Sequence, residues 1–119
     1  KVIKSDRLTK ILQAALKQSQ QFYLPQLDEL ISFEAFVAQQ QKGYIAHCNT
    51  EEKIDLADIA PTEQSNCILI GPEGDFSMDE IVFAQKNNFQ PISLGPQRLR
   101  TETAALVACH TLSLIHRNI

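Results

Sequence analysis

The chain has 119 residues, 44% of them hydrophobic and 21% charged, and its formal net charge is -3. This length allows one ordinary hydrophobic core, and the acidic balance excludes a domain that grips nucleic-acid phosphates through a broad basic surface. Three scattered cysteines exclude a disulfide scaffold, and the lack of a long apolar run excludes a signal peptide or membrane span, which together favour a cytoplasmic protein.

Two amphipathic helices are predicted in the first third of the chain. The first has its apolar residues at the spacing of one helical face, namely Leu8, Ile11, Leu12, Ala15 and Leu16. We expect the surface that covers this face to lie partly upstream of the chain. Pro25 ends this unit, and a weaker helix is predicted from about Ser32 to the glutamine run at residues 39–41.

Strands and helices alternate in the rest of the chain. Short apolar runs bounded by turn-forming residues predict buried strands at residues 44–47, 67–70 and 91–94. The acidic residues 51–63 are predicted to form a surface connection. A capping box of Ser77 and Glu80 predicts a helix to about Asn87. The alternation predicts an α/β fold with a largely parallel sheet flanked by helices.

A last helix is predicted from about Thr101 to His116. Its apolar residues surround most of its circumference, which is typical of a helix buried on several sides. In a domain this small, we expect a second subunit to supply part of that burial.

Two glycine-bearing turns, at residues 71–74 and 94–96, follow two of the predicted strands. In open α/β sheets ligands bind at the carboxyl ends of the strands, so both turns point to one edge. Backbone groups without a side chain in front of them can bind a flat heterocycle such as adenine. Ordinary tight turns without a ligand are the alternative. A phosphate loop is disfavoured, because no Lys-Ser or Lys-Thr follows and Gly-x-Gly-x-x-Gly is absent.

A dense polar cluster precedes the last helix at residues 98–103. Thr101 or Thr103 as N-cap, with Glu102 in the first turn, is a complete structural explanation. Arg98 and Arg100 beside a helix start also suit a carboxylate or a phosphate.

The histidines show no metal-binding pattern. His47, His110 and His116 have no ligand spacing with acidic residues or cysteines, so no metal site is predicted. His47 ends a predicted strand, where we expect a polar group with its hydrogen bonds satisfied.

The two turns and their flanking residues match the sequence motifs of one known family in order and spacing. The matching residues are Leu69, Ile70, Gly71, Pro72, Glu73, Gly74, Phe76, Ser77, Glu80, Ile81, Leu94, Gly95, Leu99, Arg100, Thr101, Glu102, Thr103 and Ala104. Together they look like the RsmE family of the SPOUT superfamily, which methylates N3 of a uridine in ribosomal RNA. The resemblance covers about residues 67–109, and the upstream helix with Leu24 and Pro25 is also similar.

The resemblance implies a SPOUT-type α/β knot, in which a C-terminal trefoil binds S-adenosylmethionine, and a homodimer with its active sites at the subunit interface. It implies that the substrate is 16S ribosomal RNA of the small subunit. Residues 1–119 would form a single methyltransferase domain, truncated at its N-terminus and without the family's RNA-binding barrel domain. The cofactor-binding positions that it implies are Leu69, Ile70, Gly71, Pro72, Glu73, Gly74, Leu94, Gly95, Leu99, Thr101 and Thr103.

Methylation at N3 requires removal of a proton, and so a base or a group that stabilises the anion. Arg100 is expected to stabilise charge on the uracil or on a phosphate. Glu102 is expected to support the structure or to act as the base, and Glu73 is the other acidic candidate.

Two positions depart from the family pattern. Asp75 stands where the family commonly has a second glycine, and Gln97 stands where it has an arginine, which leaves the role of Arg98 open. The acidic chain alone is expected to methylate RNA weakly. The competing hypothesis is a noncatalytic nucleotide-binding or dimerisation module.

Overall fold

The computed structural model describes residues 26–48, 53–59, 66–72, 74–95 and 98–116. The chain divides into two compact units, Lys1–Ile31 and Ser32–Ile119. The helix predicted around residues 8–16 lies outside the described residues. The described elements of the second unit are α2 (Phe33–Gln40), β1 (Gly43–Ala46), β2 (Ile54–Asp55), the 3-10 helix η1 (Leu56–Asp58), β3 (Ile68–Ile70), α3 (Met78–Lys86), β4 (Phe89–Ser93) and α4 (Thr101–His116).

Four parallel strands form one sheet in the order β2-β4-β1-β3. The central strand β1 pairs with β3 on one side and β4 on the other, so that Ile45 lies beside both Leu69 and Pro91. Because every pairing is parallel, the carboxyl ends of β1, β3 and β4 meet at one edge. The α/β class and the largely parallel sheet predicted from the sequence are therefore confirmed.

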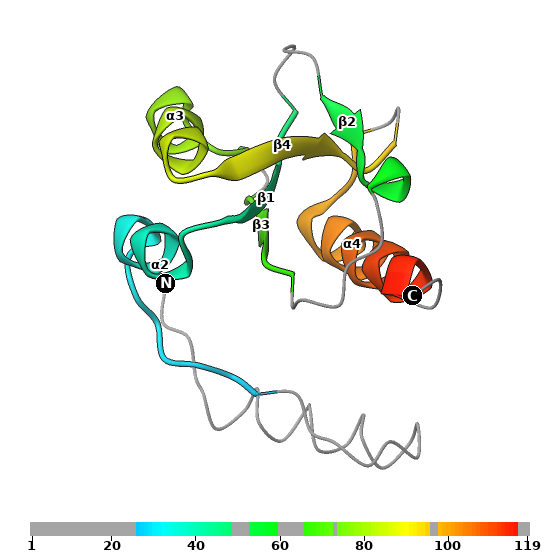
Figure 1. The fold of residues 1–119 in the computed structure, drawn as a ribbon, viewed down its shortest axis with the longest axis horizontal. Coiled ribbons are helices and arrows are strands. Elements are labelled where there is room, and N and C mark those ends of the chain that lie inside the picture. The colour runs from blue at the N-terminus through cyan, green and yellow to red at the C-terminus, as the bar shows by residue number, and fades with distance from the viewer. Residues whose placement is uncertain (1–25, 49–52, 60–65, 73, 96–97, 117–119) are drawn as a thin grey trace. The chain divides into compact units, whose positions relative to one another are not determined.

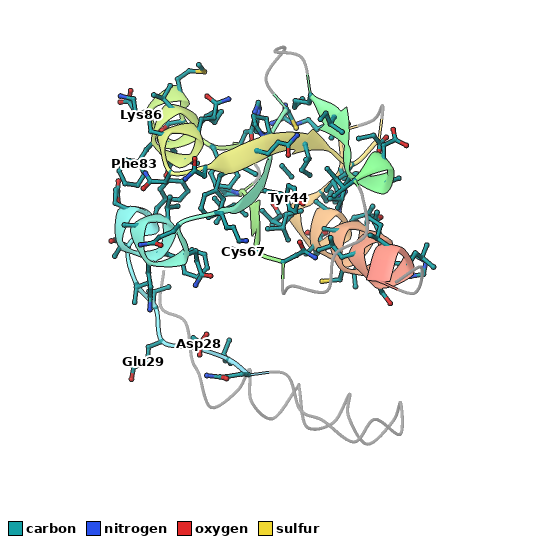
Figure 2. All side chains as sticks on the ribbon, viewed as in Figure 1. Asp28, Glu29, Tyr44, Cys67, Phe83 and Lys86 are labelled. Atoms are coloured by element: carbon teal, nitrogen blue, oxygen red, sulfur yellow. The ribbon has the colours of Figure 1, made fainter. Side chains whose placement is uncertain are left out.

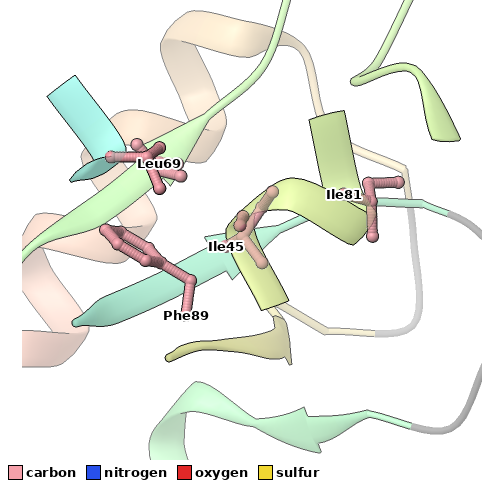
Figure 3. Packing of buried hydrophobic residues seen from close by; sticks show 6 residues of the cluster. Ile45, Leu69, Ile81 and Phe89 are labelled. Atoms are coloured by element: carbon pink, nitrogen blue, oxygen red, sulfur yellow. The ribbon is translucent and has the colours of Figure 1, made fainter. Parts of the chain in front are cut away.

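Helices cover both faces of this sheet, with α2 and α3 on one side and α4 on the other (Figure 1). Between the sheet and α2 and α3 lies a buried cluster of Val37, Ile45, Leu69, Ile81, Ala84 and Phe89 (Figure 3). The Phe33 ring contacts those of Phe76 and Phe83, at centroid distances of 5.7 and 6.3 Å. Phe83 lies on α3 where this helix meets α2 (Figure 2). This layer fixes the turn that follows β3, because Phe76 belongs to that turn.

The second face of the sheet packs against α4 and η1. Leu56, Ile92 and Ala108 are buried there, and Tyr44 of β1 packs on the same side (Figure 2). The strand residues alternate between the two clusters, as the two-residue period of a pleated strand requires. Both faces of the sheet are therefore apolar, which explains why β1 and β3 lack polar alternation, whereas β4 includes the exposed Gln90.

One prediction about the connections is wrong. The acidic residues 51–63 do not form only a surface connection, because they include β2 and η1. Leu56 has no exposed surface and packs with Ile92 and Ala108. The sequence pattern does not indicate that Leu56 is buried, because many of its neighbours in sequence are charged.

The predicted starts of two helices are confirmed. Ser32 is the N-cap of α2 and accepts a hydrogen bond from the Ala35 amide. Ser77 and Glu80 form the capping box of α3, with hydrogen bonds of 2.8 and 3.1 Å between side chain and backbone in both directions. The box fixes where the loop after β3 ends.

The cysteines Cys48, Cys67 and Cys109 are all free. Burial raises the pKa of the Cys67 thiol, which therefore stays protonated at neutral pH. Among the described residues, none of the helices combines the length and apolar character needed to cross a bilayer.

Candidate functional site

A cavity of about 310 Å³ opens at the carboxyl edge of the sheet. Its walls come from the ends of β1, β3 and β4 and from the start of α4. This volume lies at the lower end of the range for small-molecule sites. The position is where an open parallel sheet binds its ligands, because side chains and backbone groups of successive strand ends converge there.

The first wall is the turn after β3, with Ile70, Gly71 and Pro72. The Thr101 hydroxyl donates a hydrogen bond of 2.9 Å to the Gly71 carbonyl and so ties this turn to α4. A Cβ atom at Gly71 would lie 3.1 Å from the Phe76 ring, closer than an ordinary contact. The turn is thus held from both sides in a form that suits glycine.

The helix start corrects one prediction. Thr101 and Thr103 both lie inside α4, so neither is its N-cap. The Arg100 carbonyl accepts the hydrogen bond of the Ala104 amide at 2.8 Å, which makes Arg100 the residue at the cap position. The Thr101 hydroxyl instead bonds the Gly71 carbonyl, thirty residues away in sequence.

The second wall is the turn after β4, formed by Ser93, Leu94 and Gly95. Gly95 has a φ of 124°, a conformation that side-chain-bearing residues rarely adopt. The Ser93 hydroxyl donates to the Gly95 carbonyl at 2.9 Å and accepts from its amide at 3.1 Å. Glycine is therefore favoured here by its backbone conformation alone, because a Cβ atom at this position would have no neighbour within 4 Å.

The third wall was not identified from the sequence. It consists of Ala46, His47 and Cys48 at the end of β1, together with Lys53 and Asp75. The Lys53 ammonium donates to the His47 carbonyl, and an Asp75 carboxylate oxygen accepts from the Cys48 amide at 2.8 Å. The rule that strand ends form sites applies to β1 as well, although no glycine marks that turn in the sequence.

The cavity combines apolar and charged groups. Its apolar side chains include Ile92, Leu94 and Leu99, and its charged ones are Lys53, Asp75 and Arg98. Apolar walls with a few fixed charges suit a ligand that has both a flat ring and ionised groups. Among the residues that the structure describes, no cluster of three or more His, Cys, Asp or Glu side chains could hold a metal ion.

Many of the predicted cofactor-binding residues meet at this cavity, namely Ile70, Gly71, Pro72, Leu94, Gly95, Leu99 and Thr101. Leu69 packs in the core on the other face of the sheet, and Gly74 and Thr103 are exposed outside the cavity lining. Glu73 lies outside the described residues. Arg100 and Glu102 are exposed and do not line the cavity, although they are next in sequence to the lining residues Leu99 and Thr101.

The chain is similar in sequence and fold to several known methyltransferases. A curated relative named ribosomal RNA small subunit methyltransferase E, from Rickettsia conorii, is 31% identical over 115 residues, which are 92% of this chain and 47% of the relative. The crystal structure of a probable rRNA-methyltransferase from Porphyromonas gingivalis is 36% identical, with a TM-score of 0.90 over 99% of this chain and 52% of that one. The putative methyltransferase Lpg2936 from Legionella pneumophila, solved with bound SAM, is 28% identical, with a TM-score of 0.81 over 99% of this chain and 50% of that one.

The chain spans about half the length of the curated relatives it matches. The resemblance to ribosomal RNA small subunit methyltransferases noted in the sequence is confirmed by these relatives. The sequence also matches the family described as RNA methyltransferase domain over residues 1–113. Because this match covers nearly the whole chain, the chain belongs to the RNA methyltransferase domain family.

Proposed function

We propose that this chain is the cofactor-binding and catalytic part of an S-adenosylmethionine-dependent methyltransferase that acts on N3 of a uridine in 16S ribosomal RNA. The observation that carries the proposal is the single cavity formed by both glycine turns and the start of α4. The bound SAM in the similar Legionella pneumophila structure and the name of the Rickettsia conorii relative support it.

The residues of the cavity fit the methyl donor. S-adenosylmethionine has a flat adenine ring, an amino-acid group with both charges, and a sulfonium that supplies the methyl group. Leu94 and Leu99 offer apolar surface for the ring, and the backbone at Gly95 is open to it because no side chain intervenes. Lys53 and Arg98 suit the carboxylate of the amino-acid group.

The rim of the cavity is where the acceptor base would bind. Arg100 is exposed between two lining residues, so its guanidinium can reach a uracil placed over the cavity mouth. A positive charge there favours the N3 anion and positions the base for in-line attack. Glu102, exposed in the first turn of α4, is the described candidate for the base.

The knot, the homodimer, the domain boundaries and the cytoplasmic location implied by the family resemblance belong to the same proposal. The side of α4 away from the sheet supports a second subunit, because Leu106 is 71% exposed and Leu114 is 43% exposed. A second copy packed on this side would bury both leucines. Sedimentation as a monomer at micromolar concentration would contradict the dimer, and an unknotted experimental structure would contradict the knot.

The proposed reaction is tested by incubating the protein in excess over small ribosomal subunits with labelled S-adenosylmethionine. Excess protein compensates for weak RNA binding, which we expect from a chain with a net charge of -3. We expect label in 16S RNA, and N3-methyluridine on mass spectrometry of its nucleosides. Large subunits are the control and should stay unlabelled. A labelled nucleoside other than N3-methyluridine, or no label in either subunit, would contradict the proposal.

A further inference from the structure

Asp75 joins two walls of the cavity. Its carboxylate accepts a hydrogen bond of 2.8 Å from the Cys48 amide, at the end of β1 and 27 residues away in sequence. Its own amide donates to the Pro72 carbonyl at 2.8 Å, which closes the turn after β3. Asp75 and Cys48 both line the cavity. Beyond the last ladder pair of β1 and β3, Ala46 with Ile70, Asp75 therefore links the residues after β1 to the turn after β3.

The backbone of Asp75 adopts an unfavourable conformation in making its hydrogen bond to Cys48. Its φ is 68°, in the left-handed region that disfavours residues with a side chain by roughly 1–2 kcal/mol. A glycine would adopt the same conformation without that penalty. The carboxylate offsets the penalty by accepting the Cys48 amide, since hydrogen bonds to ionised groups are stronger than those between neutral groups.

The end of β1, which Asp75 contacts through the Cys48 amide, makes a second contact with a charged side chain. The Lys53 ammonium donates to the His47 carbonyl, one residue before the Cys48 amide that Asp75 binds. A cation thus binds the carbonyl and an anion binds the amide of successive residues at the end of β1. Both contacts therefore fix the backbone of His47 and Cys48 at the end of β1.

We propose that Asp75 is a positioning residue, which latches the end of β1 to the turn after β3 and thereby shapes the cavity for the methyl donor. This inference rests on the proposed function, because the ligand it concerns is S-adenosylmethionine. The role requires an oxygen acceptor on a residue that tolerates the left-handed conformation. Asparagine has both properties, and glycine has only the second.

The test is a calorimetric titration of the wild-type protein and two variants with S-adenosylmethionine. We expect Asp75→Asn to bind within about threefold of wild type and Asp75→Gly to bind about tenfold more weakly, because only the glycine removes the acceptor. Hydrogen exchange of the Cys48 amide, followed by NMR, gives a readout without ligand. It should be slow in wild type and Asp75→Asn and fast in Asp75→Gly. Asp79→Asn, an exposed position in α3 outside the cavity lining, is the matched control and should bind normally.

The outcomes separate this inference from the function on which it rests. Wild-type affinity in Asp75→Gly overturns the latch and leaves the proposed function standing. Equal weakening in the asparagine and glycine variants also overturns it, because the amide oxygen would then not replace the carboxylate. A wild-type protein that binds no S-adenosylmethionine overturns both.

Discussion

Replacement of Arg100 by alanine is expected to reduce methyl transfer to small-subunit RNA by about 100-fold or more, with little change in S-adenosylmethionine affinity. Removal of one group that stabilises developing charge has an effect of this size in other enzymes. Arg100 is exposed and does not line the cavity, so the cofactor loses no described contact with it. Single-turnover transfer and a cofactor titration measure the two effects separately.

Two further variants test whether the loss of the positive charge causes the slower methyl transfer in Arg100→Ala. Arg100→Lys keeps the positive charge and should recover part of the rate, but it lacks the planar fork of the guanidinium. Lys86→Ala removes an exposed cation from the last turn of α3, away from the cavity, and should leave transfer unchanged. If Arg100→Ala retained full activity, Arg100 would have no role in stabilising charge.

Gly43→Ala is expected to destabilise the fold by about 3 kcal/mol, since it overpacks the start of the central strand. A Cβ atom there would lie 2.7 Å from the Cys67 carbonyl oxygen and 2.7 Å from the Phe89 ring. The ring can shift, but the carbonyl cannot move freely because it accepts the Tyr44 amide at 2.8 Å. A loss of this size lowers the melting temperature of a domain of this length by roughly 10–20 °C, which thermal unfolding followed by circular dichroism detects.

The matched control for this variant is Gly74→Ala. A Cβ atom at Gly74 has no neighbour within 4 Å, so we expect a change in unfolding free energy of less than about 0.5 kcal/mol. Equal melting temperatures for the two variants would show that β1 and β3 can separate locally at little cost.

The architecture could be predicted because its signals are local. The buried strands β1 and β3 are apolar runs that can be recognised without their neighbours, and Ser77 with Glu80 marks the start of α3 within four residues. The strand predicted at residues 91–94 corresponds to β4, which begins earlier, at Phe89. Parallel pairing follows from the alternation of strands with helices. Both glycine turns could be placed at one edge for the same reason.

The remaining features depend on contacts between distant residues. The Thr101–Gly71 and Asp75–Cys48 hydrogen bonds span 30 and 27 residues, so no short pattern contains either pair. For this reason the local pattern favours Thr101 or Thr103 as a cap, and shows Asp75 only as a departure from the family pattern. Buried Leu56 was missed because it lies among charged residues, and its partner residues Ile92 and Ala108 come much later in the chain.

Residues of both glycine turns and the start of α4 line one pocket, and we propose that this pocket binds a methyl donor. Calorimetric titration of the protein with S-adenosylmethionine, S-adenosylhomocysteine and ATP tests this proposal. We expect saturable binding of both methionine-derived ligands at one site per chain and no binding of ATP. Binding of ATP, with none of either methionine-derived ligand, would contradict it and favour a noncatalytic nucleotide-binding module.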